Sequence, residues 1–81
     1  SIVELKTFKM NVYPNPATNT LNLNLINNEN FEISIYNVTG ILEKQLNSNH
    51  QIINISDLKP GIYYFTGTQN QEFFKGNFIK Q

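Results

Sequence analysis

The sequence predicts an all-β fold, an immunoglobulin-like antiparallel sandwich of about seven strands. Short segments alternate apolar with polar residues, turn signals separate these segments at short intervals, and no window has the periodicity of a helix. The length of 81 residues suffices for one domain of this kind. A chain this short buries a thin core, so we expect a stability of about 5 kcal/mol.

Residues 9–13 are the first expected strand, with Met10 and Val12 on one face. The segment Tyr13-Pro14-Asn15-Pro16 ends this strand, because prolines interrupt strand pairing and set a rigid, extended turn. Residues 1–7 alternate only weakly, and residues 1–8 precede the expected domain. We expect them to be a linker, or a fraying first strand, that joins residues 9–81 to the rest of a longer protein.

Residues 20–26 are the second expected strand, in which leucines alternate with Asn22 and Asn24. This is the pattern of a half-buried strand with one wet face. Leucine also favours helices, but asparagine at every second position counts against a helix here. A turn at residues 27–30 is expected to follow.

Residues 31–38 form the next expected strand, and Thr39-Gly40 is its hairpin turn. The segment 42–46 is short and polar, which suits the edge of a sheet. A further strand is expected at residues 51–55.

The chain is organised around a corner at residues 55–65, where it leaves one sheet and enters the other. Ser56 and Asp57 are expected to cap backbone N–H groups of this turn, and Pro60 restricts the backbone before it. Gly61 is expected to have a conformation or a close contact that a side chain would disturb.

Residues 61–68 have apolar side chains on both faces, which indicates a central strand. Residues 72–80 are the last strand, where Phe78 and Ile79 point to opposite faces, so one of the two is expected to be exposed beside the cation of Lys80. The residues expected in the core come from the inward faces and the corner: Leu21, Leu23, Leu25, Ile33, Ile35, Ile53, Ile55, Leu58, Tyr63 and Phe65.

Six lysines balance six acidic residues, so the formal net charge is zero, and the chain contains no arginine. Nucleic-acid binding needs a concentrated basic face, and this composition argues against it. The absence of cysteine excludes disulfides, thiolate metal sites and a cysteine nucleophile. No apolar run approaches the length of about 20 residues that a membrane span requires.

Side chains suited to catalysis are sparse. The single histidine, His50, lies in an Asn/Ser turn, and Asp57 has no second carboxylate near it in the sequence for acid–base chemistry. Glu29, Glu32 and Glu43 would have to meet across strands to bind calcium. We therefore expect no enzymatic activity, no metal and no cofactor.

Three segments, taken together with the chain end, resemble a known family. They are Val12-Tyr13-Pro14-Asn15-Pro16-Ala17, Ile33-Ser34-Ile35-Tyr36-Asn37-Val38-Thr39-Gly40 and residues 53–65, and the chain closes with Lys75-Gly76-Asn77-Phe78-Ile79-Lys80. In this order and spacing they resemble the type A C-terminal sorting domain of the type IX secretion system of Bacteroidota. The resemblance spans residues 9–81, and Gln81 after Lys80 departs mildly from the usual apolar–basic ending.

The resemblance implies a non-catalytic signal domain at the C-terminus of a secreted cargo protein. In the family, the cargo reaches the periplasm by an ordinary signal peptide, and an outer-membrane translocon with its shuttle protein then recognises the folded domain. A sortase-like cysteine protease commonly removes the domain, and the cargo is attached to the cell surface or released. On this view residues 1–8 lie at the junction with the cargo.

A signal that is read after folding should carry its information on loops or on an exposed strand. The candidate recognition residues come from the proline turn, two turn glycines and the chain end: Tyr13, Pro14, Asn15, Pro16, Gly40, Gly61, Phe78, Ile79 and Lys80. Removal of residues 78–81 is expected to stop export and leave a folded domain, and Lys80→Ala to leave the core untouched.

Two alternative functions share the predicted fold. A carbohydrate-binding module usually presents exposed aromatic side chains in a row, but tryptophan is absent from this chain. A fibronectin-like spacer has no specific partner, so it would tolerate loss of the ending sequence.

Overall fold

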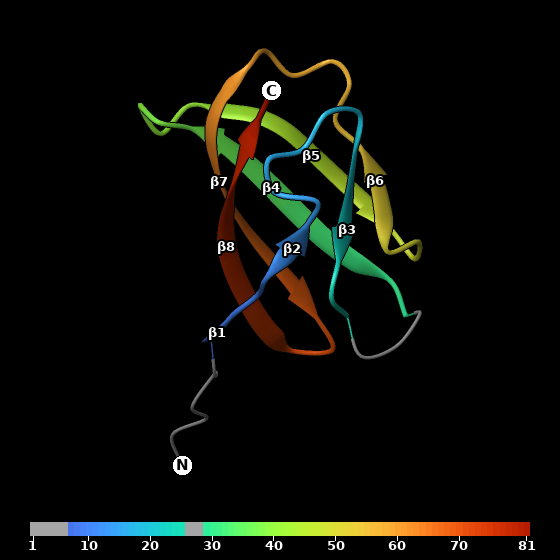
Figure 1. The fold of residues 1–81 in the computed structure, drawn as a ribbon. Coiled ribbons are helices and arrows are strands. Elements are labelled where there is room, and N and C mark those ends of the chain that lie inside the picture. Colours follow the sequence, from blue (N-terminus) through green and yellow to red (C-terminus); the bar gives the residue numbers. More distant parts are fainter. Residues whose placement is uncertain (1–6, 26–28) are drawn as a thin grey trace.

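The computed structural model describes residues 7–25 and 29–81, which contain strands and no helix (Figure 1). The strands are β1 (Thr7–Lys9), β2 (Val12–Tyr13), β3 (Thr20–Leu23), β4 (Phe31–Asn37), β5 (Leu42–Ser48), β6 (Ile52–Asn54), β7 (Gly61–Gln69) and β8 (Glu72–Lys80). Nothing in these two ranges forms a helix able to span a membrane. The expected features at residues 1–6 and 26–28 lie outside the described residues.

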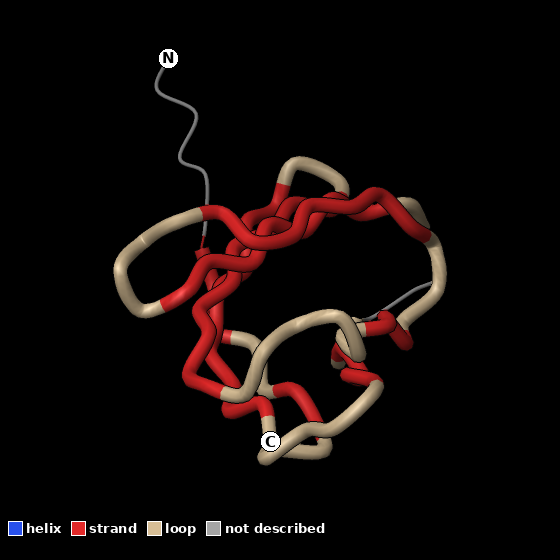
Figure 2. Tube along the Cα trace, turned by 90° about the horizontal axis from the view of Figure 1, so that it is seen from above, coloured by secondary structure: helices blue, strands red, loops and turns tan. Residues whose placement is uncertain are grey.

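The strands form two sheets that pack as a sandwich. The five-stranded sheet has the order β1-β8-β7-β4-β5, and the three-stranded sheet has the order β2-β3-β6. Figure 2, seen from above, shows the two sheets as separate layers. The predicted all-β sandwich is confirmed, with β7 inside the larger sheet and β5 at its edge, as expected. β1 departs from the antiparallel pattern, because it runs parallel to β8.

The prediction of one strand at residues 9–13 is wrong, because this segment divides between the two sheets. β1 pairs with β8, and Met10 extends this pairing by donating its N–H to the Lys75 carbonyl oxygen at 2.7 Å. The chain then crosses to the other sheet, where Val12 lies opposite Leu23. Met10 and Val12 are both buried, because the crossing runs beside the core.

The other strands differ from the expected ones mainly at their ends. β5 continues to Ser48, β3 ends at Leu23, and β6 covers only Ile52–Asn54. Leu25 and Ile55 lie beyond these strands, yet both are buried. A side chain can face the core without ladder hydrogen bonds on its own backbone, so alternation predicts burial better than it predicts strand ends.

Every residue expected in the core is buried, and aromatic rings of β7 and β8 fill the interior. The Phe65 ring centroid lies 6.2 Å from that of Phe74 and 6.4 Å from that of Phe78, which stacks on Tyr63 at 5.5 Å. These separations are typical of favourable aromatic pairs. Phe74, Phe78 and Ala17 also belong to the core, although they were not among the expected residues.

Two glycines make room for two of these rings. Gly67 lies opposite Phe74 in the β7–β8 ladder, and Gly76 lies opposite Phe65. A Cβ at Gly67 would stand 2.1 Å from Phe74 Cζ, and a Cβ at Gly76 would stand 2.5 Å from Phe65 Cζ. Each ring therefore packs over the glycine opposite it, in a space that any side chain would occupy.

The corner closes one end of the core with Leu58, which is buried. Its first turn is capped by Asn54, whose Oδ1 accepts the N–H of Ser56 at 2.8 Å. The Leu58 N–H donates to the Ile55 carbonyl oxygen at 3.0 Å. Ser56 and Asp57 were expected to cap this turn. The side chain that accepts the Ser56 N–H is instead that of Asn54, at the end of β6.

Side chains from the larger sheet hold the rest of the corner. Lys44 of β5 forms an ion pair with Asp57 at 3.0 Å. The Tyr63 hydroxyl donates to the Lys59 carbonyl oxygen at 2.6 Å. The corner is thus tied to β5, β6 and β7 together.

Gly61 begins β7 with a φ of +158°, a positive value that residues with a side chain rarely adopt. A Cβ at this position would have Tyr63 Cε2 as its nearest neighbour, at 4.0 Å, which is ordinary contact. The expectation of a conformation or a close contact at Gly61 is therefore confirmed through its positive φ, whereas no close contact occurs there. Close approach occurs at Gly67 and Gly76, where the backbone faces aromatic rings.

Candidate recognition surface

Several turns and the chain end meet at one end of the sandwich, which we call the upper end (Figure 1, top). The register explains this, because β4 ends, β7 begins and β8 ends there. The segments at the upper end are the proline turn 13–17, the hairpin turn 38–41, the corner 55–60 and residues 79–81. The described chain starts at the opposite end, since Thr7 lies opposite Phe73 at the beginning of β8.

The proline turn is joined to the end of β8 by hydrogen bonds that involve the side chain of Asn15 and the backbone of Ala17. The Ile79 N–H donates to Asn15 Oδ1 at 2.9 Å, and these residues are 64 positions apart. The Ala17 N–H donates to the Ile79 carbonyl oxygen at 2.7 Å, and the Gln81 N–H donates to the Ala17 carbonyl oxygen at 2.8 Å. We call this set of contacts the clasp; it makes the turn and the chain end one surface.

The side chains of the proline turn face solvent, although its backbone is anchored. Tyr13 is 59% exposed, and Pro14, Asn15 and Pro16 are exposed as well. The peptide bonds before both prolines are cis. Asn22 of β3 donates its Nδ2 hydrogen to the Tyr13 carbonyl oxygen at 3.1 Å. The turn is therefore held from β3 and β8, while the side chains of Tyr13, Pro14 and Pro16 stay available to a partner.

At the chain end, Phe78 is buried and Ile79 is 46% exposed, so the expectation that they face opposite ways is confirmed. The expected exposed cation at Lys80 is wrong, because only 8% of this residue is exposed. Alternation along β8 turns Lys80 to the same side as Phe78, and its Nζ donates to the Gln81 carbonyl oxygen at 3.0 Å. Lys80→Ala would thus remove a buried side chain.

The two candidate glycines both lie at the upper end. Gly61 is opposite Lys80 in the β7–β8 ladder, next to the chain end. Gly40 belongs to the hairpin turn, where its φ of +85° favours glycine. Asn37 organises that turn, because its Oδ1 accepts the N–H and the hydroxyl of Thr39 at 3.0 and 2.7 Å. The sequence did not indicate the roles of Asn15 and Asn37, although Asn beside a turn is a recognised signal.

Charge interactions in the described structure are local. Hydrogen bonding from Lys44 lowers the pKa of the Asp57 carboxyl group from its usual value. Burial, and then the nearby Glu43 carboxylate, raise the pKa of the Tyr63 hydroxyl. Both shifts move the pKa of the group further from neutral pH, so neither shift creates a general acid or base that works near neutral pH.

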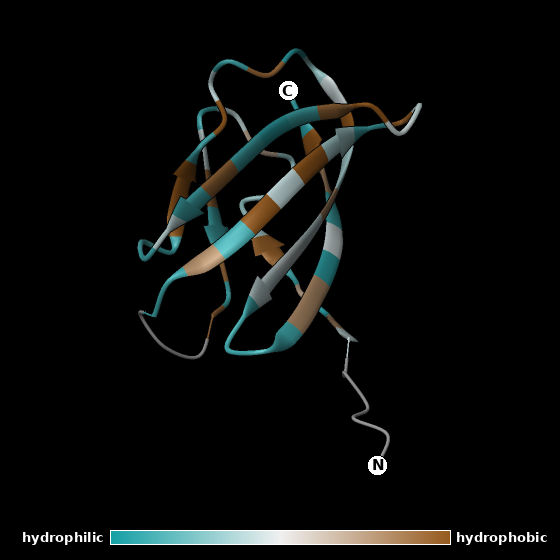
Figure 3. Cartoon of the chain, turned by 180° about the vertical axis from the view of Figure 1, so that it is seen from behind, coloured by the Kyte–Doolittle hydropathy of each residue, from teal (hydrophilic) through white to brown (hydrophobic). Residues whose placement is uncertain are grey.

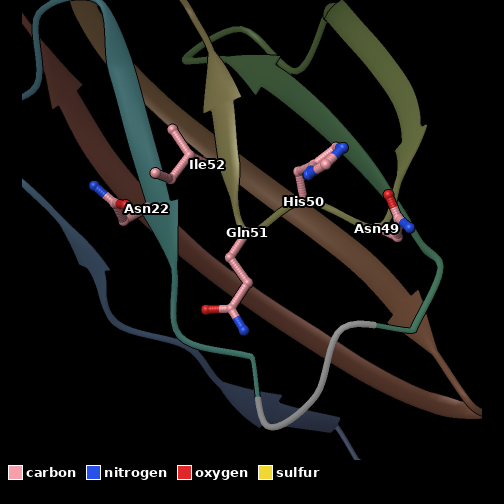
Figure 4. A pocket seen from close by; sticks show the side chains of 5 residues that line it. All are labelled: Asn22, Asn49, His50, Gln51 and Ile52. Carbon is pink, nitrogen blue, oxygen red and sulfur yellow. The ribbon is translucent and has the colours of Figure 1, made fainter.

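A hollow beside the three-stranded sheet has a volume of about 720 Å³ and is lined by Asn22, Asn49, His50, Gln51 and Ile52 (Figure 4). Figure 4 shows these side chains spread around the hollow, not directed at one point. Among the described residues, no three His, Cys, Asp or Glu side chains are grouped to hold a metal ion. The hollow therefore offers little to fix a ligand.

The fold and the upper end define a class of protein: a small β-sandwich whose exposed turn is clasped to its last strand. The model of one family, the secretion system C-terminal sorting domain, matches residues 11–81. The chain belongs to this family. No curated protein matches the chain.

Membership of this family confirms the function predicted from the sequence. The domain is a C-terminal secretion signal of the type IX secretion system, which exports its substrates across the outer membrane to the cell surface or into the medium. Sorting domains of this family are non-catalytic and interact with the secretion machinery. Neither the carbohydrate-binding nor the spacer alternative receives support.

Proposed function

We propose that the secretion machinery recognises the upper end of the sandwich, where the proline turn meets the end of β8. The clasp carries this proposal, because the hydrogen bonds that join Asn15 and Ala17 to the chain end combine two distant segments into one surface. Tyr13 and Ile79 are exposed on this surface. A partner can therefore bind both segments without opening the core.

The finer roles of the partners follow from this arrangement. The outer-membrane translocon and its shuttle protein bind the upper end, while the cargo is joined through residues 1–8 to the domain at 9–81. β1 starts at Thr7, beside the start of β8 and away from the upper end. A sortase-like cysteine protease would cut near this junction without disturbing the recognised surface. The domain itself supplies no catalysis and passes through the periplasm before it reaches the surface.

The proposal is tested with Tyr13→Ser in a reporter fused before residue 1 and expressed in a host that carries the secretion system. Export is expected to fall at least about tenfold, which corresponds to about 1.4 kcal/mol of lost binding, a typical loss for an exposed tyrosine at the centre of an interface. The melting temperature should stay near that of the wild type, because Tyr13 is 59% exposed. Reporter in the periplasm and outside the cell is quantified by immunoblot.

The matched control is Phe73→Ser, which removes a partly exposed aromatic side chain at the opposite end of β8. This variant is expected to export normally. If Tyr13→Ser exports as well as the wild type, or if Phe73→Ser fails to the same degree, the upper end is not the recognised surface.

A further inference from the structure

The outer face of the five-stranded sheet carries an apolar strip close to the upper end. We call the residues Tyr36, Leu42, Ile62, Tyr64 and Ile79 the outer strip. Tyr36 lies opposite both Leu42 and Tyr64, and Ile62 lies opposite Ile79. Directly opposite residues have Cβ atoms about 4.5–5.5 Å apart, so the strip is continuous over β5, β4, β7 and β8.

The outer strip is not covered by any described part of the chain. Leu42 and Ile79 are each 46% exposed, and Ile62 and Tyr64 are each 49% exposed. Figure 3, seen from behind, shows apolar bands alternating with polar ones along these strands. The wet face of an antiparallel sheet is usually polar, and a contiguous apolar patch on it marks a site of interaction.

Two lysines lie next to the outer strip. Lys9 of β1 is opposite Lys75 of β8, and a hollow of about 230 Å³ joins both to Tyr64. Like charges in directly opposite positions repel each other. The ion pair found within residues 7–25 and 29–81 joins Lys44 to Asp57 and leaves both lysines of the outer face without a carboxylate. Their charge is thus available to a partner.

The charges of this face are divided between its two sides, with the two lysines at β1 and β8 and with Glu32 and Glu43 at β4 and β5. Glu32 is the acidic residue of β4 on this face, and its Oε1 accepts a hydrogen bond from Gln45 at 3.4 Å. Glu43, at the edge, accepts a hydrogen bond from Asn37 Nδ2 at 2.8 Å. The side of this face at β1 and β8 is therefore locally positive, although the whole chain has no net charge. It fits a partner that is locally negative.

We propose that the outer strip and the Lys9–Lys75 pair form a docking surface for a segment of the secretion machinery in which aliphatic or aromatic side chains adjoin carboxylates. The apolar side chains cover Ile62 and Tyr64, and the carboxylates lie against the two lysines. This rests on the proposed function, since Ile79 belongs to both surfaces and the family requires the machinery as partner. The recognised surface therefore extends from the upper end onto the larger sheet.

The test uses the same reporter fusion with two changes in the docking surface. Tyr64→Thr removes the ring and introduces a β-branched residue, which suits a strand, and Lys75→Glu reverses one charge. Each is expected to lower export at least about tenfold with an unchanged melting temperature. Thr68→Ala, further along β7, is the matched control and should export normally. If the melting temperature of Tyr64→Thr is clearly lower than that of the wild type, Leu42→Thr on the edge strand replaces it in the comparison.

The outcomes separate this proposal from the proposed function. Normal export of Tyr64→Thr and Lys75→Glu, with export of Tyr13→Ser defective, overturns the docking surface and leaves the proposed function in place. Normal export of all three overturns both. Sedimentation of the purified domain tests a second copy of this chain as the partner: a wild-type dimer that becomes monomeric in Tyr64→Thr assigns the outer strip to self-association and overturns the proposal. A wild-type monomer with defective export of both strip variants supports it.

Discussion

Gly67 and Gly76 each face a phenylalanine across the β7–β8 ladder, and the ring lies where a side chain on the glycine would begin. These contacts make both glycines sterically necessary, although their backbone is ordinary strand. Phe65 and Phe74 could not both lie in the core if either glycine carried a methyl group in the same backbone. At the scale of single residues, the density of the core therefore depends on two positions with no side chain.

Gly67→Ala is expected to lower the free energy of unfolding by about 1–3 kcal/mol, the usual effect of overpacking. The added methyl would overlap Phe74, and it would also stand 2.6 Å from the Glu32 carbonyl oxygen, which is backbone and moves little. Urea denaturation measures the change. Thr66→Ala, the neighbouring outward position, should lose less than about 1 kcal/mol. Equal losses in the two variants would contradict the steric explanation.

At the scale of elements, the clasp decides how the last strand ends. β8 lies between β1 and β7 only near its start, because β1 reaches only Lys9, which lies opposite Lys75. Beyond that point the proline turn takes the place of a neighbouring strand, through Asn15 and Ala17. The turn thus acts as a short surrogate strand, which explains why a terminal segment that would otherwise fray is ordered.

Asn15→Ala removes the acceptor of the Ile79 N–H and is expected to lower stability by about 1 kcal/mol. Amide hydrogen exchange at Ile79 should become faster, while exchange in the middle of the β7–β8 ladder stays the same. Asn19→Ala in the same loop is the control, because its backbone carbonyl oxygen holds the Ile55 N–H and this survives the substitution. Unchanged exchange at Ile79 in Asn15→Ala would show that the clasp does not order the chain end.

At the scale of the whole molecule, the end of the chain is part of the core. Phe78 is 1% exposed and stacks on Tyr63, and Lys80 is buried beside it in the same strand. A domain of 81 residues has little stability to lose. Signal and structure therefore overlap at the C-terminus, and a truncation there does not test recognition alone.

Removal of residues 78–81 is consequently expected to abolish the cooperative unfolding transition, contrary to the folded product anticipated from the sequence. Loss of a buried phenylalanine alone typically costs about 3–5 kcal/mol, close to the whole stability of a small domain. Thermal denaturation followed by circular dichroism measures this. Removal of Gln81 alone loses its hydrogen bond to Ala17 and the one that it accepts from Lys80 Nζ, and should lower the melting temperature by only a few degrees. A cooperative transition near the wild-type temperature in the longer truncation would disprove the prediction.

Much of the fold was predictable because it depends on neighbouring residues. The alternation of apolar and polar side chains decides which face of a strand turns inward, and it placed Leu21, Ile33 and Phe65 in the core correctly. Turn residues such as Gly40 also depend only on neighbouring residues, so they marked the ends of strands. The candidate site was predictable in part: Tyr13 and Ile79 are exposed as a recognition role requires, whereas Lys80 is not.

The sequence by itself determined most of the strands, most of the core and, through its ordered motifs, the family. Only the tertiary structure decided that residues 9–13 divide between two sheets, that Gly67 and Gly76 are the tight glycines, and that Asn15 holds Ile79. These features arise where segments distant in sequence come into contact. Neither segment carries a local signal of the other, so their geometry exists only once the two sheets have packed.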